Sequence, residues 1–330
     1  MPRIPTDSTD QSEDTGIEDY ISAGNVVPII SHTFSNDLVF GGHDAFIERY
    51  TKYIQYPFQR TDDFPRVLQF KSVVDEKGLW DLAYHYVNFA KNHLFEMAER
   101  ADFPSEYLQE LEEEFDQLTF SQFADRLKYP KFDQISEPQL HPLLILANFP
   151  LPIYITTSYH GFLEKALEKA KKKPVTEICY WHDGLKNIQS VLDQGFEPSI
   201  DEPIVYHLCG YDEYPTSMVL TEDNFLQFLV AISEFRGKDG DRIAGRIREA
   251  VSASQILLLG FDLDTWEFRS LFWGLIEGRN PWAPKSVSIQ LRPTQEESLF
   301  FEKYMAKAKF DVIWSDIDSF LRDLHQKVQS

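Results

Sequence analysis

The sequence predicts an α/β protein: a Rossmann-like parallel sheet flanked by helices, with a large helical insertion. Short apolar runs alternate with segments long enough for helices, which is typical of parallel strands joined by helical crossovers. Three of these runs lead directly into polar residues and then into a helical pattern, as at the carboxyl edge of an open sheet. The 330 residues, 43% of them hydrophobic, are enough to bury a large core.

The elements are predicted in chain order as follows. Residues 1–16 are polar and acidic, and we expect a solvated, disordered tail there. A buried strand at Asn25–Ser31 leads into a polar turn at His32–Asp37. Helical periodicity over residues 43–140 predicts the insertion, so residues 17–42 and 141–330 should form one Rossmann-like domain. Its further strands are predicted at Pro152–Thr156, Glu177–Trp181, Ile204–Leu208, Gln255–Leu259, Val287–Leu291 and Phe310–Trp314.

Composition excludes several classes of function. The formal net charge of −21 disfavours nucleic-acid binding, which needs clustered lysine and arginine. Cys179 and Cys209 are the two cysteines, too few for a four-thiolate zinc site, and they fit a reducing compartment. Neither a membrane-spanning apolar run nor a signal peptide is evident. We therefore expect a cytoplasmic protein without a metal, membrane or nucleic-acid partner.

Three blocks of sequence carry a family resemblance. ITTSYHGFLEKAL begins at Ile155, VYHLCGYDEYPTSMVLTEDNFLQFL at Val205, and ILLLGFDLDTWEFRSLF at Ile256. In order and spacing they resemble the Thr-Thr-Asn, His-Gly and Gly-Phe/Tyr segments of sirtuin-like domains, specifically the zinc-free, prokaryotic defence-type branch. This resemblance implies a domain that binds NAD, and it disfavours a zinc-dependent deacetylase because the zinc cysteines are missing.

The resemblance also assigns a cofactor-binding set. The family's Gly-Ala-Gly-x-Ser loop, which brings backbone amides to the phosphates, falls on residues 31–35, where both glycines are replaced and only the closing serine remains. Side chains at Ser31 and Thr33 would hinder that approach and restrict positive φ. The predicted cofactor-binding residues are Ser31, His32, Thr33, Ser35, Thr156, Thr157, Gly210 and Gly260. The alternative for Thr156 and Thr157, with the adjacent Ser158, is a strand end and a helix cap.

The positions that the family uses for catalysis are changed as well. Ser158 stands at the asparagine position, His160 at the next acidic position, and Cys209 at the position of the histidine base. A thiol has a reference pKa of about 8.5 and is mostly protonated at neutral pH. His207, two residues before Cys209 on a predicted strand, would share its face and could act as the base, or His160 could act from the opposite lip. The alternative is a hydrogen-bonded core histidine.

We therefore expect a sirtuin-like module of a prokaryotic antiviral defence or signalling system that binds NAD or a derivative such as ADP-ribose, with impaired catalysis. One alternative is an active NAD hydrolase that releases nicotinamide through Ser158, His160, His207 or Cys209. A second alternative is a structural partner whose pocket is filled by side chains. A homo-oligomer or a defence-system protein is the expected macromolecular partner.

Two acidic features have a structural interpretation. The spacing of Asp264 and Glu267 predicts a capping box, in which both carboxylates serve the start of a helix. Glu164 is expected to lie on a solvated helix face.

Overall fold

The structure of this chain is a computed structural model that describes residues 16–61, 63–101, 103–134, 140–277, 279, 282–290 and 295–329. The predicted tail at residues 1–16 lies outside the described residues, apart from Gly16. That glycine is the N-cap of the first helix, α1 (Ile17–Ser22).

A seven-stranded, entirely parallel sheet forms the centre of the fold and confirms the predicted α/β class. The strand order is β3-β4-β2-β1-β5-β6-β7. The strands are β1 (Val26–Ile30), β2 (Ile153–Thr156), β3 (Val175–Ile178), β4 (Ile204–His207), β5 (Gln255–Leu259), β6 (Ser286–Gln290) and β7 (Phe310–Trp314). Every residue of the central strands β1 and β5 is buried, as in a sheet covered on both faces.

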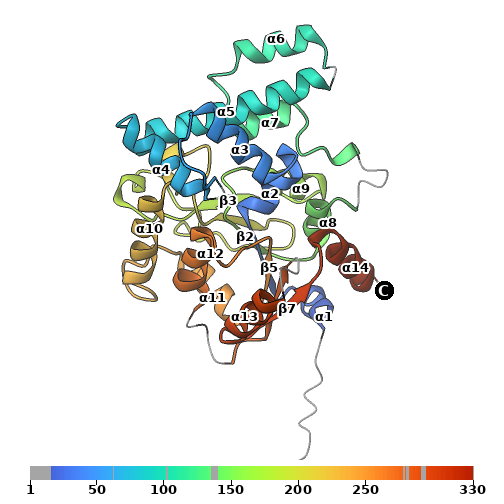
Figure 1. The fold of residues 1–330 in the computed structure, drawn as a ribbon. Helices are drawn as coiled ribbons and strands as arrows, with labels where there is room; N and C mark the ends of the chain where they lie inside the picture. The colour runs from blue at the N-terminus through green and yellow to red at the C-terminus, as the bar shows by residue number, and fades with distance from the viewer. Residues whose placement is uncertain are drawn as a thin grey trace, which may run out of the picture.

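Two groups of helices cover the sheet, and Figure 1 shows them on its two sides. One group holds α1, α8 (Pro142–Asn148) and α14 (Ile317–Gln329), which pack on one another. The other holds α10 (Glu222–Glu234), α11 (Gly245–Ala253), α12 (Trp266–Leu271) and the π-helical turn η5 (Phe272–Ile276). The remaining core elements are α2 (His32–Phe40), α9 (Phe162–Lys169), α13 (Gln295–Ala306), η3 (Asp183–Leu185) and η4 (Pro215–Ser217).

The segment predicted as an insertion contains only helices and turns in its described part. These are α3 (His43–Tyr53), α4 (Phe64–Val74), α5 (Leu79–Arg100), α6 (Ser105–Glu113), α7 (Phe120–Arg126) and η1 (Phe132–Gln134). Figure 1 shows α3 to α7 together above the strands. Their aromatic core joins the Rossmann core, because Phe46 of α3 stacks on Phe40 of α2 with ring centroids 4.4 Å apart. The domain boundaries at residues 43 and 140 stay a prediction.

The structure corrects two local predictions. The residues expected to form a polar turn, His32–Asp37, are instead the start of α2. The reason is local: the Ser31 hydroxyl accepts a hydrogen bond from the Phe34 amide at 3.0 Å and caps the helix. Gly41, in the left-handed region at φ 75°, ends it. The third strand also begins two residues earlier than the predicted Glu177–Trp181.

Gly210 is required by backbone packing after β4. Its φ is +98°, and a Cβ at this position would overlap the carbonyl oxygen of Ser217. This close approach lets the Val219 amide donate to the Cys209 carbonyl at 2.8 Å, which returns the chain toward α10.

We expect Gly210→Ala to lower the free energy of unfolding by about 1–3 kcal/mol, because alanine would be strained at this φ. Urea denaturation measures the change. Gly245→Ala is the matched control: Gly245 opens α11 with no neighbour near its Cβ position, so alanine should be neutral or stabilise by up to about 1 kcal/mol. Equal stability of Gly210→Ala and wild type would contradict this reasoning.

Candidate functional site

The candidate site lies where the order of the strands reverses. The chain passes from β1 to β2 on one side of the sheet and later adds β5 on the other side, so β1 and β5 flank the switch point. In open α/β sheets ligands bind outside the carboxyl ends of the strands at this point. A cavity of about 340 Å³ lies there, within the usual range of small-ligand sites. It is lined by a residue following each of four strands: His32 (β1), Thr157 (β2), Cys209 (β4) and Gly260 (β5).

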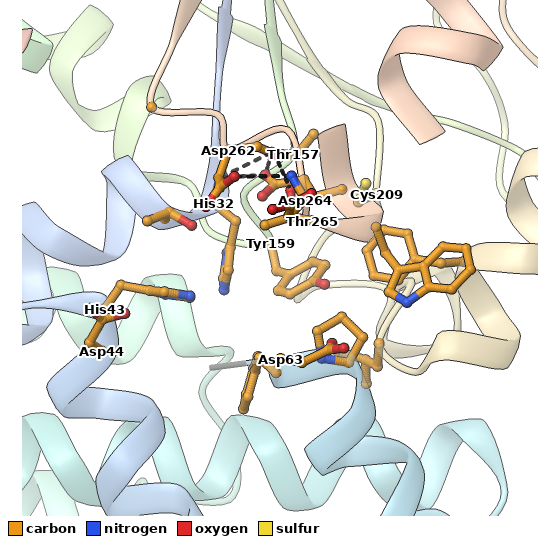
Figure 2. Close-up of a pocket in the computed structure, with 18 of the residues that line it drawn as sticks. His32, His43, Asp44, Asp63, Thr157, Tyr159, Cys209, Asp262, Asp264 and Thr265 are labelled. Carbon is orange, nitrogen blue, oxygen red and sulfur yellow. Dashed lines mark hydrogen bonds between the residues drawn. The ribbon is translucent and has the colours of Figure 1, made fainter. Parts of the chain in front are cut away.

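The helices of residues 43–140 close the cavity from the opposite side. Figure 2 shows His43, Asp44 and Asp63 across the cavity from Thr157 and Cys209. Phe64 and Pro65 at the start of α4 complete this wall. The site is therefore enclosed between the carboxyl edge of the sheet and the helical segment.

A partly buried carboxylate ties three elements together at the base of the cavity. Glu267 of α12 accepts a hydrogen bond from the His32 amide, the first of α2, at 2.8 Å, and another from the Thr157 hydroxyl. Burial raises the pKa of Glu267, against the two hydrogen bonds that lower it. The predicted capping box is therefore wrong: Thr265 caps α12 through the Phe268 amide, and Glu267 serves a different helix.

Gly260 lets the α2 start pack against the end of β5. Its φ is +79°, and a Cβ there would lie 2.5 Å from Ser31 Oγ and 2.6 Å from the Phe34 Cβ. Only glycine permits this approach. The residue also lines the cavity, so its packing role and a ligand contact are compatible.

A second cavity adjoins the first on the side of β6 and β7. It has a volume of about 520 Å³ and shares Thr33, Gly260 and Asp262 with the first cavity. Phe301 and Trp314 supply aromatic surface to it. The start of α2 borders both cavities, because Thr33 lines each of them.

Two neutral histidines stand in the first cavity. Burial, followed by the neighbouring His43 and His160, holds the pKa of His32 well below its usual value, and burial lowers the pKa of His43 against the opposing Asp37. Asn36 Nδ2 lies 3.0 Å from His32 Nε2 and 3.2 Å from His43 Nδ1. An amide nitrogen donates, so both ring nitrogens accept, and His32 carries its proton on Nδ1. Among the described residues His32 Nδ1 has no hydrogen-bond partner.

Carboxylates dominate the lining of this cavity. They are Asp44, Asp63, Asp262, Asp264 and Glu267, and the lysine or arginine among the described lining residues is Arg60 alone. A diphosphate would therefore meet an unfavourable field, whereas a cationic ring would be stabilised.

His207, predicted as a substitute base, lies outside the lining of the first cavity. It is completely buried, with Nδ1 2.7 Å from the Ser158 carbonyl oxygen and Nε2 2.7 Å from Glu164 Oε1. Burial alone would lower the pKa of His207, but the Glu164 carboxylate, together with the Ser158 carbonyl and Asp212, raises it above its ordinary value. Glu164 is correspondingly 8% exposed and not on the expected solvated face. The pair joins the end of β4 to α9.

Of the other predicted catalytic residues, Ser158 and His160 lie outside the lining of the first cavity, and Cys209 lies within it. His160 is buried against the Phe120 ring at 4.1 Å between centroids, and its Nδ1 lies 3.9 Å from Asp212. Burial lowers its pKa, although Asp212 opposes this. The Ser158 hydroxyl accepts from the His160 amide at 3.3 Å. Cys209 does line the cavity, and burial raises the pKa of its thiol, which keeps it protonated.

The predicted binding residues divide into two groups. His32, Thr33, Thr157 and Gly260 line the first cavity. Ser31, Ser35, Thr156 and Gly210 lie outside its lining. The hydroxyls of Ser35 and Thr156 donate to the carbonyl oxygens of Ser31 and Ile30 at 3.1 and 3.0 Å, which supports the alternative of a structural role for Thr156.

Sequence reasoning missed several lining residues. Asp63, His43 and Asp44 lie in the segment without a family resemblance, and nothing in their spacing indicated a site. Tyr159, directly after the Thr-Thr-Ser run, was overlooked although its neighbours were chosen. The position of Glu267, an acidic residue shortly after a predicted strand, was a signal for the site, but its spacing from Asp264 favoured a helix cap.

The family is identified by residues 152–313, which match a family model described as "SIR2-like domain". This chain carries a SIR2-like domain. The match runs from the start of β2 into β7, and β1 and the helical segment precede it. No curated protein matches the chain in sequence.

The residues that the structure describes lack two kinds of feature. They contain no group of three or more histidine, cysteine, aspartate or glutamate side chains arranged to hold a metal ion. Within the same residues, no helix combines the length and apolar character needed to cross a bilayer.

We expect Glu164→Gln to destabilise the protein by about 2 kcal/mol at pH 5.5, because it removes the charge that pairs with His207. The pKa of His207 is raised in the folded protein, so its contribution is fully present below the unfolded value of about 6.5 and is lost as pH rises through the folded pKa. The deficit should therefore shrink at pH 8.5.

Urea denaturation at the two pH values tests this. The control is Glu168→Gln on the same helix, where an exposed carboxylate faces Lys165 and the change should stay within about 0.5 kcal/mol. If the loss of stability in Glu164→Gln grew with pH, the ion pair with Glu164 would not be what raises the pKa of His207.

Proposed function

We propose that this chain is a sirtuin-like module that binds NAD or a derivative such as ADP-ribose and cleaves the nicotinamide bond poorly or not at all. The observation that supports it best is the pair of cavities meeting at Thr33, Gly260 and Asp262 beside the switch point of the sheet. A dinucleotide is an elongated ligand with two ring systems, and this two-part site matches it. We assign the site to a domain of residues 17–42 and 141–330, with residues 43–140 inserted to cover it.

The two cavities differ in ways that suit the two halves of NAD. The second cavity offers the Trp314 and Phe301 rings, on which an adenine could stack. The first cavity offers histidine and tyrosine rings with surrounding carboxylates, which suit the positively charged nicotinamide ring. We therefore place adenosine in the second cavity and nicotinamide riboside in the first.

Impaired catalysis follows from the groups that are missing near the first cavity. Release of nicotinamide builds positive charge on the ribose carbon and needs a base for a hydroxyl proton. Cys209 is a protonated thiol there, while His207 is bound to Glu164 and the Ser158 carbonyl. His160 is occupied by the aromatic and acidic contacts of its buried surroundings. These contacts favour binding over cleavage.

The alternatives remain distinguishable. An active NAD hydrolase would require one of these residues to leave its present contacts or His32 to act as the base. A structural partner with a filled pocket is disfavoured by the open volume of the first cavity. From the family resemblance we further propose a role in a prokaryotic antiviral defence or signalling system, acting in the cytoplasm with a second copy or a defence protein as partner.

We expect pure protein to bind NAD and ADP-ribose in calorimetry while releasing no nicotinamide from NAD in a chromatographic assay. Nicotinamide release that His207→Ala abolishes would support the hydrolase instead. Absence of binding to both ligands would favour the structural partner. A zinc-dependent deacetylase is not expected under any of these outcomes.

Trp314→Leu should weaken ADP-ribose binding by about 1–3 kcal/mol, because loss of the indole removes an adenine stacking surface. Calorimetric titration with ADP-ribose measures this. Trp273→Leu is the control, since that half-exposed indole lies on η5, away from both cavities. Equal affinities for wild type and Trp314→Leu would contradict the placement of adenosine in the second cavity.

A further inference from the structure

The N-terminus of α2 is the natural anion position of this site. The first amides of a helix carry a partial positive charge and lack intrahelical partners, so they bind phosphates and carboxylates. α2 has nine residues and begins at the switch point between β1 and β5. A diphosphate that crosses from one cavity to the other passes this helix start, because both cavities include Thr33.

The protein itself fills that anion position. The Glu267 carboxylate accepts from the His32 amide at 2.8 Å and from the Thr157 hydroxyl. The Ser31 hydroxyl accepts from the next capped amide, that of Phe34. The first amide of α2 is therefore already bound to a negative oxygen supplied by α12.

A second observation indicates a ligand at the same place. His32 is 7% exposed and lines the first cavity, yet its Nδ1 has no hydrogen-bond partner among the described residues. Asn36 directs the ring proton to Nδ1, so this nitrogen is a donor without an acceptor. A buried donor without an acceptor is costly, and an oxygen of a ligand would satisfy it.

A ligand phosphate and the Glu267 carboxylate cannot both use the His32 amide. One N–H donates one strong hydrogen bond, and two negative groups at contact distance repel each other. The repulsion is not offset locally, because four aspartates and one arginine form the rest of the charged lining that the structure describes. The His32 amide also donates to the Thr157 hydroxyl at 3.0 Å. Rotation of the Glu267 side chain, without movement of the backbone, would remove the charged acceptor and leave this neutral one.

We propose that Glu267 determines which ligands this site accepts: its carboxylate takes the place of a phosphate at the N-terminus of α2, and a diphosphate ligand binds only by displacing it. This proposal rests on the proposed NAD-type ligand and adds a specificity that the sheet alone would not give. A ligand without phosphate leaves the Glu267 carboxylate bound to the His32 amide and occupies only the cavities. A diphosphate must compete with the protein's own carboxylate, so its affinity is lowered in wild type.

Calorimetry with two probes tests the proposal. ADP-ribose is the diphosphate probe and nicotinamide riboside is the phosphate-free probe, and each is titrated into wild type and Glu267→Gln. We expect Glu267→Gln to bind ADP-ribose about tenfold more tightly, because a neutral amide competes less and does not repel phosphate. Its affinity for nicotinamide riboside should not rise, because this ligand has no phosphate and its cationic ring loses a nearby carboxylate.

Asp264→Asn is the matched control. It removes the same unit of charge from the same cavity, but Asp264 is exposed and pairs with Arg269 instead of the helix start. Its ADP-ribose affinity should stay within about twofold of wild type, because solvent screens an exposed carboxylate. A gain equal to that of Glu267→Gln would overturn the proposal and attribute the effect to net charge.

A measurement on wild type covers the case in which Glu267→Gln does not fold. The ¹H–¹⁵N resonance of the His32 amide should shift when ADP-ribose binds, and by more than when nicotinamide riboside binds, because only ADP-ribose replaces its charged acceptor. ADP-ribose binding that leaves the His32 resonance unmoved, or that Glu267→Gln leaves equal or weakens, overturns this inference while the proposed function stands. Absence of ADP-ribose and NAD binding to both proteins overturns the proposed function and the inference with it.

Discussion

The site depends on the pairing of β1 with β5, two strands that are far apart in the sequence. Their register runs from Val26 opposite Gln255 to Ile30 opposite Leu259, and the Ser31 amide continues it by donating to the Leu259 carbonyl at 3.0 Å. On the other side of β1, the Thr157 amide donates to the Ile30 carbonyl at 3.0 Å. The segments that follow β1, β2 and β5 therefore leave the sheet side by side. The contacts at the base of the first cavity follow from this alignment.

The residues after β1 make the carboxyl edge of this sheet different from that of a sheet with a glycine-rich loop at the same place. A glycine-rich loop lets a ligand phosphate approach the backbone. Here Ser31 begins a helix at once by capping it, and Phe34 of that helix packs on Gly260. The glycine at this contact, Gly260, thus follows β5 instead of β1. The first amide of the helix still points out of the sheet edge, and a carboxylate from α12 has become its acceptor.

The strands could be predicted from sequence because each is a short apolar run buried on both faces, and their common direction follows from the helical connections. The start of α2 could not, because a run of polar residues suits a turn as well as a capped helix until the partner of each side chain is known. The alternation argument that placed His207 beside Cys209 failed for a similar reason. β4 ends at His207, and the chain turns at residues 208–209, so the two side chains no longer share a face.

Contacts between distant segments account for the rest of what the sequence did not reveal. Glu164 looked like a solvated carboxylate on a charged helix, but the fold brings α9 to the end of β4, where Glu164 Oε1 lies 2.7 Å from His207 Nε2. Glu267 looked like part of a cap for its own helix, but the pairing of β1 with β5 brings the start of α2 to it. The residues next to each of these carboxylates in the sequence suit an exposed position. Their partners come from another strand or helix, which residue spacing alone does not specify.

The charge of the site is the last consequence of this arrangement. A protein with a formal charge of −21 would be expected to collect cations at a phosphate site, yet the charged side chains that line the first cavity are mostly carboxylates. The dipole of α2 offsets one of these charges at Glu267, and the exposed aspartates are screened by solvent. What remains favourable in this cavity is a ring that carries positive charge or a sugar that donates hydrogen bonds. Both describe the nicotinamide riboside half of NAD, so the electrostatics orient the dinucleotide even while they oppose its phosphates.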